Sequence, residues 1–209
     1  MELYSYWRST TAYRVRIALN LKALDYQIRT VNLVAGEHNQ PDYLALNPGH
    51  GVPTLVLEDG HILTQSMAIL DWLEEAHPDP ALLVGNAVER AHQRAAALTV
   101  ATDIHPVNNL KVLKKLKQMG CSDDDTVAWM RDWMQYGFAA FQTLIRDNTL
   151  FCFGEQPGLA DICLVPQLYN AHRWGVDLSP FARLTEIETR CLALPAFDNA
   201  RPENQPDAT

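Results

Sequence analysis

The sequence lacks the cysteine and histidine spacings from which metal sites and disulfide frameworks are built. Its four cysteines lie far apart with no C-x-x-C pair, and its seven histidines form no H-E-x-x-H pattern. Common zinc sites need paired ligands of these kinds. Scattered cysteines are typical of reduced thiols in a cytoplasmic protein. We therefore expect no metal ion, no disulfide framework and a cytoplasmic location.

The sequence is also poor in positive charge. It has 17 Lys and Arg against 25 Asp and Glu, which gives a formal net charge of −8. Without a basic stripe, a nucleic-acid partner is not expected. The N-terminus has neither a basic region nor a long apolar run, so we expect no secretion signal and no membrane span. With 47% hydrophobic residues, the 209-residue chain has an ordinary globular composition for one or two domains.

The first 80 residues alternate between strand and helix patterns. Asp59-Gly60 is a strong hairpin-turn signal between two of the strands. We expect Ser66 to cap the helix that follows the hairpin. The predicted elements are, in order, a strand from the first residues to Trp7, a helix after Thr11, a strand at 26–33 parallel to the first, and strands at 52–57 and 62–64. This order predicts an α/β domain over residues 1–80.

A linker rich in proline and glycine at 76–86 separates this domain from a helical remainder. Beyond the linker the apolar residues recur with a helical period almost throughout. The predicted helices are 88–117, bent near Pro106, followed by 123–146, 159–172 and one within 178–193. The tail from Pro195 is expected to be irregular. We therefore expect an all-helical second domain over residues 87–209.

Three hydroxyl side chains, Ser9, Thr10 and Thr11, stand at the predicted junction of the first strand and first helix. The first-turn amides of a helix have no intrahelical partners, and the dipole is positive there. Such a place favours an anion, and hydroxyl donors strengthen the preference. The same residues could simply cap the helix. On local grounds both interpretations stay open.

Five segments spread over nearly the whole chain match a known family. They are R-S-T-T-A-Y-R-V-R-I-A-L (8–19), A-L-N-P-G-H-G-V-P-T-L (45–55), T-Q-S-M-A-I-L-D-W-L-E-E (64–75), D-I-H-P-V-N-N-L-K-V-L (103–113) and G-L-A-D-I-C-L-V-P-Q (158–167). On these segments the chain resembles the zeta class of cytosolic glutathione transferases, which includes maleylacetoacetate isomerase. V-P-T-L followed by Q-S is shared by many glutathione transferases, whereas S-x-x-x-x-R-V-R-I-A-L is more specific to the zeta class. The resemblance implies a thioredoxin-like first domain, an all-α second domain and a homodimer.

The resemblance also implies a glutathione site. The thiol of the bound glutathione would be ionised by hydrogen bonds from the three hydroxyls. Ser9 would be the chief donor, and Thr11 would be the second. The family commonly has Ser-Ser-Cys here, so this chain lacks the cysteine. The remaining contacts would be a backbone pairing at Val52 beside a cis Pro53, the γ-glutamyl group at Gln65 and Ser66, the glycyl end at His38, and polar groups at His105, Asn108 and Asn109.

On the substrate side, two arginines would bind carboxylates and stabilise an enolate. Arg8 precedes the hydroxyls, and Arg173 matches a substrate-binding arginine of the zeta class. The resemblance implies that glutathione thiolate adds to the cis double bond of a diketo acid, that the bond rotates, and that the thiolate leaves. Arg14 and Arg16 are expected to make structural pairs instead. Asp161 is expected to serve in a helix-capping box in which Gly158 replaces the usual Ser or Thr.

Several functions fit these features. The first is isomerisation of maleylacetoacetate in aromatic amino acid catabolism, and a close rival is isomerisation of maleylpyruvate. A general transferase acting on halogenated acids is a second class. A non-catalytic binding or structural protein is a third, although a scaffold would not need Ser9, Val52-Pro53 and Gln65-Ser66 together. Surface salt bridges remain an alternative role for both arginines, and a polar dimer seam remains one for Asn108 and Asn109.

Overall fold

A computed structural model describes all residues, 1–209, and contains two units. The first unit joins Met1–Ala81 to Leu192–Thr209, and the second is Leu82–Cys191. We expected the second domain to run from residue 87 to residue 209. Residues 192–209 belong to the first unit instead.

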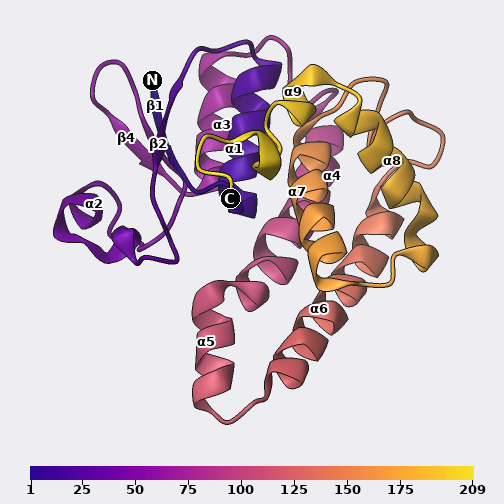
Figure 1. The fold of residues 1–209 in the computed structure, drawn as a ribbon. Coiled ribbons are helices and arrows are strands. Elements are labelled where there is room, and N and C mark those ends of the chain that lie inside the picture. Colours follow the sequence, from indigo (N-terminus) through magenta and orange to yellow (C-terminus); the bar gives the residue numbers. More distant parts are fainter. The chain divides into compact units, whose positions relative to one another are not determined.

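The first unit has a mixed sheet of four strands in the order β2-β1-β3-β4. β1 and β2 are parallel, as predicted, and the other two pairings are antiparallel. The helices α1 and α3 pack against each other beside the sheet (Figure 1). This is the predicted thioredoxin-like fold. The elements are β1 (Glu2–Ser5), α1 (Thr10–Leu21), β2 (Gln27–Thr30), a 3₁₀ helix (Glu37–Asn39), α2 (Pro41–Leu46), β3 (Thr54–Val56), β4 (Ile62–Thr64) and α3 (Ser66–Ala76).

Apolar side chains explain why these elements stay together. Leu3 of β1 and Leu55 of β3 are opposite each other in register and fully buried. On the helices, Ile17 and Ile69 are fully buried as well. Burying one such side chain stabilises the fold by roughly 1.5–3 kcal/mol. The strands are shorter than predicted, because Tyr6, Trp7 and the ends of the 26–33 segment leave the ladder.

The tail after residue 194 is folded, which corrects the prediction of an irregular segment. It contains the short helix α9 (Pro195–Asp198) and a 3₁₀ helix (Pro202–Asn204). The amide of Asn20 in α1 donates to the Ala196 carbonyl at 3.0 Å. Arg16, fully buried, donates to the Ala200 carbonyl at 3.0 Å. These bonds from α1 explain why the tail belongs to the first unit.

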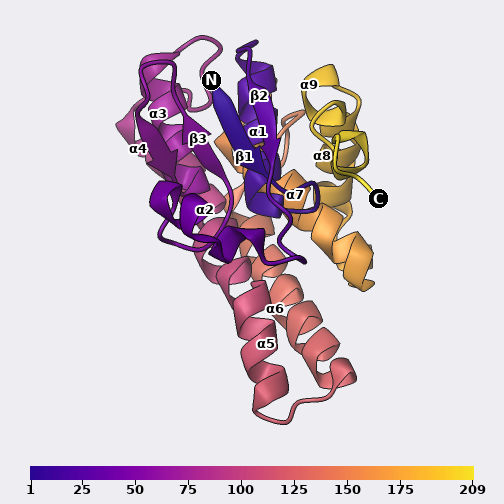
Figure 2. The ribbon, with the colours of Figure 1, turned by 60° about the vertical axis from the view of Figure 1, so that its left-hand side comes forward.

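The second unit is helical throughout, and the predicted single helix over 88–117 is wrong. The chain there forms α4 (Ala87–Leu98), a π-helical turn (Thr99–Ile104), a 3₁₀ turn (Pro106–Asn108) and α5 (Leu110–Gln118). Pro106 cannot donate a backbone hydrogen bond, which ends the helical ladder. The unit continues with α6 (Asp123–Leu144), α7 (Leu159–Trp174), a 3₁₀ turn (Ser179–Phe181) and α8 (Ala182–Leu192). Figures 1 and 2 both show α5 alongside α6.

Gly137 in α6 allows the π-helical turn to approach closely. A Cβ atom at this position would lie 2.1 Å from Cγ1 of Ile104, a distance that real atoms do not reach. Ile104 is fully buried. Trp129 of α6 donates from Nε1 to the Val107 carbonyl at 3.0 Å, just beyond the turn. α6 therefore fixes the irregular segment that follows α4.

Asp161 caps α7 as expected. Its carboxylate accepts from the amides of Cys152 and Gly158, both at 2.9 Å. Burial raises the pKa of Asp161, and these amide bonds oppose that effect. A side chain at Gly158 would place its Cβ 2.8 Å from the Leu82 carbonyl. The close approach of that backbone explains why glycine stands where the family usually has Ser or Thr.

None of the helices combines the length and the apolar character that a membrane span requires. All four cysteines are free thiols, and three of them are buried.

Candidate active site

The strand register brings three predicted site segments to one edge of the sheet. Tyr4 of β1 pairs with Thr54 of β3, which pairs in turn with Thr64 of β4. Because β3 runs antiparallel to both neighbours, the end of β1, the start of β3 and the end of β4 lie together. The segments beyond these ends are 6–11, Val52-Pro53 and Gln65-Ser66. The register therefore places the predicted hydroxyl, backbone and γ-glutamyl contacts at the same edge.

Two hydroxyls and one carbonyl form a hydrogen-bonded chain at this edge. Thr11 Oγ1 donates to the Val52 carbonyl at 2.8 Å. Ser9 Oγ and Thr11 Oγ1 are 2.9 Å apart. Since the Thr11 proton points to Val52, the Ser9 hydroxyl donates to Thr11. Ser9 Oγ also accepts from the Ala12 amide at 3.2 Å. The Ser9 proton is thus the one that can turn toward a bound anion without breaking the link to Val52.

The capping interpretation of the hydroxyl cluster is confirmed at Ser9, and the anion-binding interpretation is compatible with it. Ser9 occupies the N-cap position of α1, with extended backbone. It is half-buried, as is Thr11, so both remain within reach of a ligand. Thr10 differs, because it is only 4% exposed. A capping role and an anion-binding role are compatible at Ser9, and Thr10 is the least accessible of the three.

The loop that carries Ser9 is held from both sides at Trp7. Arg16 Nη2 donates to the Trp7 carbonyl at 3.1 Å, and the Trp7 amide donates to Asp207 Oδ2 at 3.0 Å. Arg16 also donates to Ser5 Oγ at 2.9 Å. Arg16 therefore has the predicted structural role. Sequence reasoning missed Asp207, which lies 200 residues from Trp7 and in a segment predicted to be irregular.

Arg8 presents its guanidinium next to the hydroxyl chain. Its Cζ lies 4.4 Å from the centre of the Trp7 ring, and Nη2 donates to the Tyr6 hydroxyl at 3.3 Å. Its buried Nε has no hydrogen-bond partner. The side chain is stacked and forms no salt bridge, so the alternative of a surface salt bridge does not describe Arg8. An arginine in this state can still bind a carboxylate.

The backbone of the other two segments departs from the commonest conformations. The Val52–Pro53 peptide bond is cis, as predicted. Gln65 has φ +68°, which is rare for a residue with a side chain. Strained backbone of this kind occurs most often at functional sites. The positive φ of Gln65 is not predicted from the sequence, and no sequence signal marks it.

Ser66 is the first residue of α3, and Gln65 takes the cap position predicted for Ser66. The shift by one residue follows from the left-handed backbone of Gln65, which lies outside the helix. Ser66 is 5% exposed, and its hydroxyl accepts from Arg14 Nη1 at 3.3 Å. Arg14 is almost fully buried. The structural role predicted for Arg14 is therefore confirmed, and it links α1 to the start of α3.

His38 lies in the 3₁₀ helix before α2. Burial, with a smaller effect of His50, lowers the pKa of His38. Its buried Nδ1 has no hydrogen-bond partner, while Nε2 lies 3.0 Å from the Asn39 amide. An unpartnered buried ring nitrogen is costly unless a ligand or water completes it.

The site residues predicted in the second unit fall on the irregular segment between α4 and α5. His105 follows the π-helical turn and is half-buried. Asn108 is 8% exposed, and neither end of its amide has a partner. Asn109 caps α5, because its side chain accepts from the Lys111 amide at 3.2 Å. Asn108 thus has hydrogen-bonding capacity to offer, whereas Asn109 has a structural role already.

Arg173 lies in the last turn of α7 and is exposed. Its Cζ is 4.7 Å from the centre of the Trp174 ring. Stacking of this kind orients the planar guanidinium without using all its donors.

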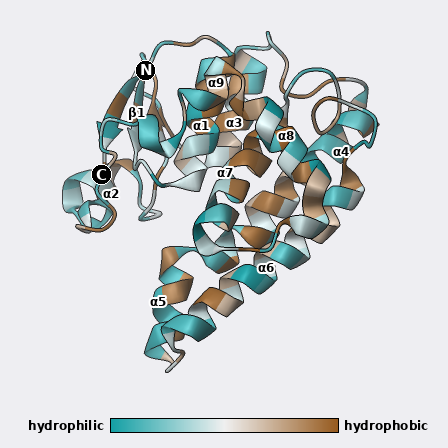
Figure 3. Cartoon of the chain, turned by 45° about the vertical axis from the view of Figure 1, so that its right-hand side comes forward, coloured by the Kyte–Doolittle hydropathy of each residue, from teal (hydrophilic) through white to brown (hydrophobic).

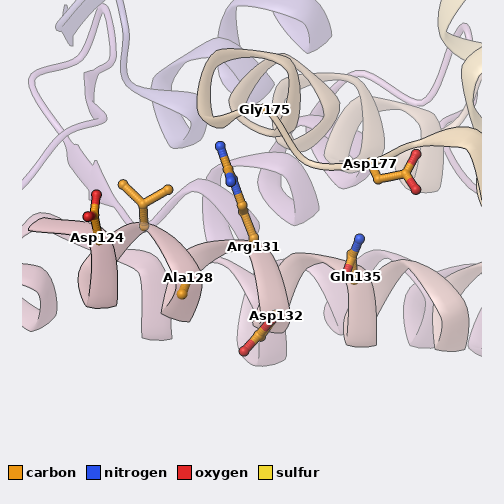
Figure 4. A pocket seen from close by; sticks show the side chains of 8 residues that line it. Asp124, Ala128, Arg131, Asp132, Gln135, Gly175 and Asp177 are labelled. Carbon is orange, nitrogen blue, oxygen red and sulfur yellow. The ribbon is translucent and has the colours of Figure 1, made fainter.

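A separate hollow of about 530 Å³ lies in the second unit between α6 and the turn after α7 (Figure 4). Arg131 points across it toward Gly175, and its Nε donates to the Trp174 carbonyl at 2.7 Å. The remaining polar lining comes mainly from Asp124, Asp132 and Asp177. No predicted site residue lines this hollow. No group of three or more His, Cys, Asp or Glu side chains could hold a metal ion.

Known proteins similar to this chain share its fold. Residues 8–76 match the family model of the glutathione S-transferase N-terminal domain. A maleylacetoacetate isomerase of Pseudomonas aeruginosa is 50% identical over 99% of this chain and 98% of its own length. The holo structure of a bacterial zeta-class maleylpyruvate isomerase superposes with a TM-score of 0.97, at 42% identity and with full coverage of both chains.

A third relative shows what such a protein binds. The maleylacetoacetate isomerase of Anaeromyxobacter dehalogenans, crystallised with dicarboxyethyl glutathione and citrate in its active site, has a TM-score of 0.90 and 46% identity, covering 100% of this chain and 97% of its own. Identity at this level over the whole length shows the family. The chain belongs to the zeta class of the glutathione S-transferases, together with the maleylacetoacetate and maleylpyruvate isomerases.

Proposed function

We propose that this protein is a glutathione-dependent cis–trans isomerase acting on an unsaturated diketo acid, with maleylacetoacetate as the first candidate. The observation that carries the proposal is the chain from Ser9 through Thr11 to the Val52 carbonyl, at the N-terminus of α1 and beside a cis proline. Hydroxyl donors at a helix N-terminus suit a thiolate. The full-length likeness to isomerases supports the same conclusion.

The first unit offers a donor and acceptor set that fits glutathione. Val52 supplies backbone groups of the kind that pair with an extended peptide, next to Pro53. Gln65 and the amide of Ser66, at the start of α3, suit the γ-glutamyl carboxylate. The unpartnered Nδ1 of His38 suits the glycyl end. The chemistry of these groups matches a tripeptide with a carboxylate at each end.

Bound glutathione supplies a thiol that can add reversibly to a conjugated double bond. Ser9 turns its proton from Thr11 to the sulfur and so lowers the pKa of the thiol. Thr11 holds Ser9 in place through its bond to Val52. Because this chain has threonine where the family commonly has cysteine, the site supplies hydrogen bonds and no protein sulfur.

Two arginines are proposed to bind the substrate's carboxylate and stabilise negative charge on its oxygens. Arg8 is next to Ser9 and keeps free donors on its stacked guanidinium. Arg173 is assigned by its match to the zeta class and by its stacking on Trp174. In the second unit, His105 and Asn108 are proposed as further polar contacts, because the buried amide of Asn108 lacks partners.

Maleylpyruvate is the second candidate substrate, favoured by the TM-score of 0.97 to a maleylpyruvate isomerase. We also propose a homodimer and a cytoplasmic location. Large apolar side chains stand exposed on the second unit, among them Val88 at 65% and Tyr136 at 71%, as expected of a surface that a subunit covers. Light scattering would test the dimer.

The experiment mixes purified protein with maleylacetoacetate or maleylpyruvate, each with and without glutathione, and follows the cis isomer by absorbance. We expect glutathione-dependent loss of the cis isomer and appearance of the trans isomer with at least one of the two. Arg173→Ala should raise KM for the substrate and leave glutathione binding unchanged. If neither substrate reacts in a glutathione-dependent way, the isomerase proposal is wrong.

A further inference from the structure

The lysines of this chain are concentrated on a single helix. The sequence contains only five, and four of them lie in α5, within Leu110–Gln118. The fifth, Lys22, is buried in the first unit, where it pairs with Glu74. Every exposed lysine therefore lies on α5, although the protein as a whole carries a net charge of −8. The charge of α5 is therefore opposite in sign to the net charge of the protein.

Three of these lysines share one side of the helix. At 3.6 residues per turn, Lys111, Lys114 and Lys115 lie within about 100° of one another around the axis. None of the three forms a salt bridge, whereas Lys117 pairs with Asp123. All three are exposed. They form a surface of uncompensated positive charge, which we name the lysine surface.

The opposite side of α5 is apolar, as the alternation of colour along this helix in Figure 3 shows. Val112, Leu113 and Leu116 are half-buried there, and α5 packs on α6. Only the residues at the two ends, Leu110 and Met119, are largely exposed. A helix that lies on a membrane needs its whole apolar face free. The covered apolar face therefore favours a small anion in solution over a lipid surface.

We propose that the lysine surface captures the anionic substrate, a dicarboxylate, for the isomerase site. This inference rests on the proposed function. The lysine surface follows His105 and Asn108, the polar residues proposed above as contacts in the site, and the Lys111 amide donates to the side chain of Asn109, which caps α5. Anions drawn to α5 are therefore concentrated beside that segment.

The physical need for such a surface follows from charge. A protein of net charge −8 repels a dicarboxylate, and glutathione is also an anion. At physiological ionic strength the Debye length is about 8 Å, so local charges outweigh distant ones. Clustered charges of one sign can raise association rates by roughly 10- to 1,000-fold. Three uncompensated lysines would supply the lower end of that range.

The experiment measures the association rate of maleate, a simple cis dicarboxylate, with the glutathione-loaded protein by stopped-flow tryptophan fluorescence. It compares ionic strengths of about 0.01 M and about 1 M, where the Debye length is about 30 Å and about 3 Å. The wild-type rate should fall steeply with salt. K111Q/K114Q/K115Q should bind maleate about three- to tenfold more slowly at low salt, and equally fast at high salt.

Two controls separate position from net charge. Arg29 and Arg201 lie outside the site, and K114Q/K115Q and R29Q/R201Q each remove two positive charges. K114Q/K115Q should slow maleate binding at low salt, and R29Q/R201Q should change the rate less. K111R/K114R/K115R keeps the charge and should behave as wild type. Since maleate binding needs no turnover, the result stands apart from the isomerase assay.

Four outcomes would overturn the inference. The first is a triple lysine variant that matches wild type at low salt, and the second is an equal loss of rate in K114Q/K115Q and R29Q/R201Q. The third is the absence of maleate binding. Lysine-dependent binding of wild type to phosphatidylserine vesicles, with an unchanged maleate rate, would assign the surface to lipid and refute capture of the substrate.

Discussion

Replacing Ser9 by alanine separates its observed role as a helix cap from its proposed role as a donor to thiolate. As the cap of α1, Ser9 accepts from the Ala12 amide at 3.2 Å, and losing a cap of this kind costs about 1 kcal/mol of stability. As a donor to thiolate, it provides a hydrogen bond to a charged group, worth roughly 1.5–3 kcal/mol. Losing this hydrogen bond to the thiolate would therefore raise the pKa of the bound thiol by about one to two units.

At a pH below both pKa values, the thiolate fraction should therefore fall about 10- to 100-fold in S9A, and kcat/KM with it. The assay is a pH titration of the thiolate absorbance of bound glutathione, set beside a pH profile of kcat/KM. S9T keeps the hydroxyl and should restore most of the effect. T11V removes the bond to Val52 and should cost less, because the Thr11 proton is already committed to that carbonyl.

The result that would refute this reasoning is an unchanged thiol pKa in S9A with a lowered thermal midpoint. Ser9 would then be a helix cap and nothing more. Equal, full activity in S9A and T11A would remove both hydroxyls from the mechanism.

Three further predictions follow from local geometry. Q65G should raise the thermal midpoint, since glycine relieves backbone strain of about 1 kcal/mol at φ +68°, yet weaken glutathione binding measured by calorimetry. G137A should destabilise the protein by about 1–3 kcal/mol in denaturant unfolding, because the added methyl group would overlap Ile104. D207A leaves the Trp7 amide without its acceptor, and should speed hydrogen exchange of that amide and lower kcat/KM.

The G137A and D207A predictions each have a control in the same region. G137A combined with I104A should lose less stability than the sum of the two single variants, and fully additive losses would contradict the proposed overlap. D207N keeps an acceptor oxygen and should resemble wild type. E203Q changes an exposed carboxylate of the same tail, so an effect equal to that of D207A would make the Trp7 contact irrelevant.

Local sequence signals predicted the first unit well. The Asp59-Gly60 turn and the adjacent strand patterns gave the hairpin, and the intervening helix indicated parallel pairing of the first two strands. These features depend on residues close in sequence, where turn chemistry and periodicity act directly. The hydroxyl cluster was found for the same reason, because a strand-to-helix junction is a local feature.

Contacts between distant residues could not be predicted in this way. The clamp on Trp7 needs Asp207, and the tail was interpreted as irregular because its own composition is polar and rich in proline. Its folding depends on Arg16 and Asn20, which lie in α1. The break after Leu98 was missed for another reason. A π-helical turn preserves a nearly helical pattern of apolar residues, and only its hydrogen bonds differ.

The central claim is that glutathione acts here as a catalyst, held by the first unit and regenerated in each cycle. The most direct measurement supplies substrate in large excess over glutathione and follows both the cis isomer and the free thiol. We expect complete conversion to the trans isomer with no loss of thiol. Consumption of one thiol for each substrate molecule, or equal conversion without glutathione, would contradict it.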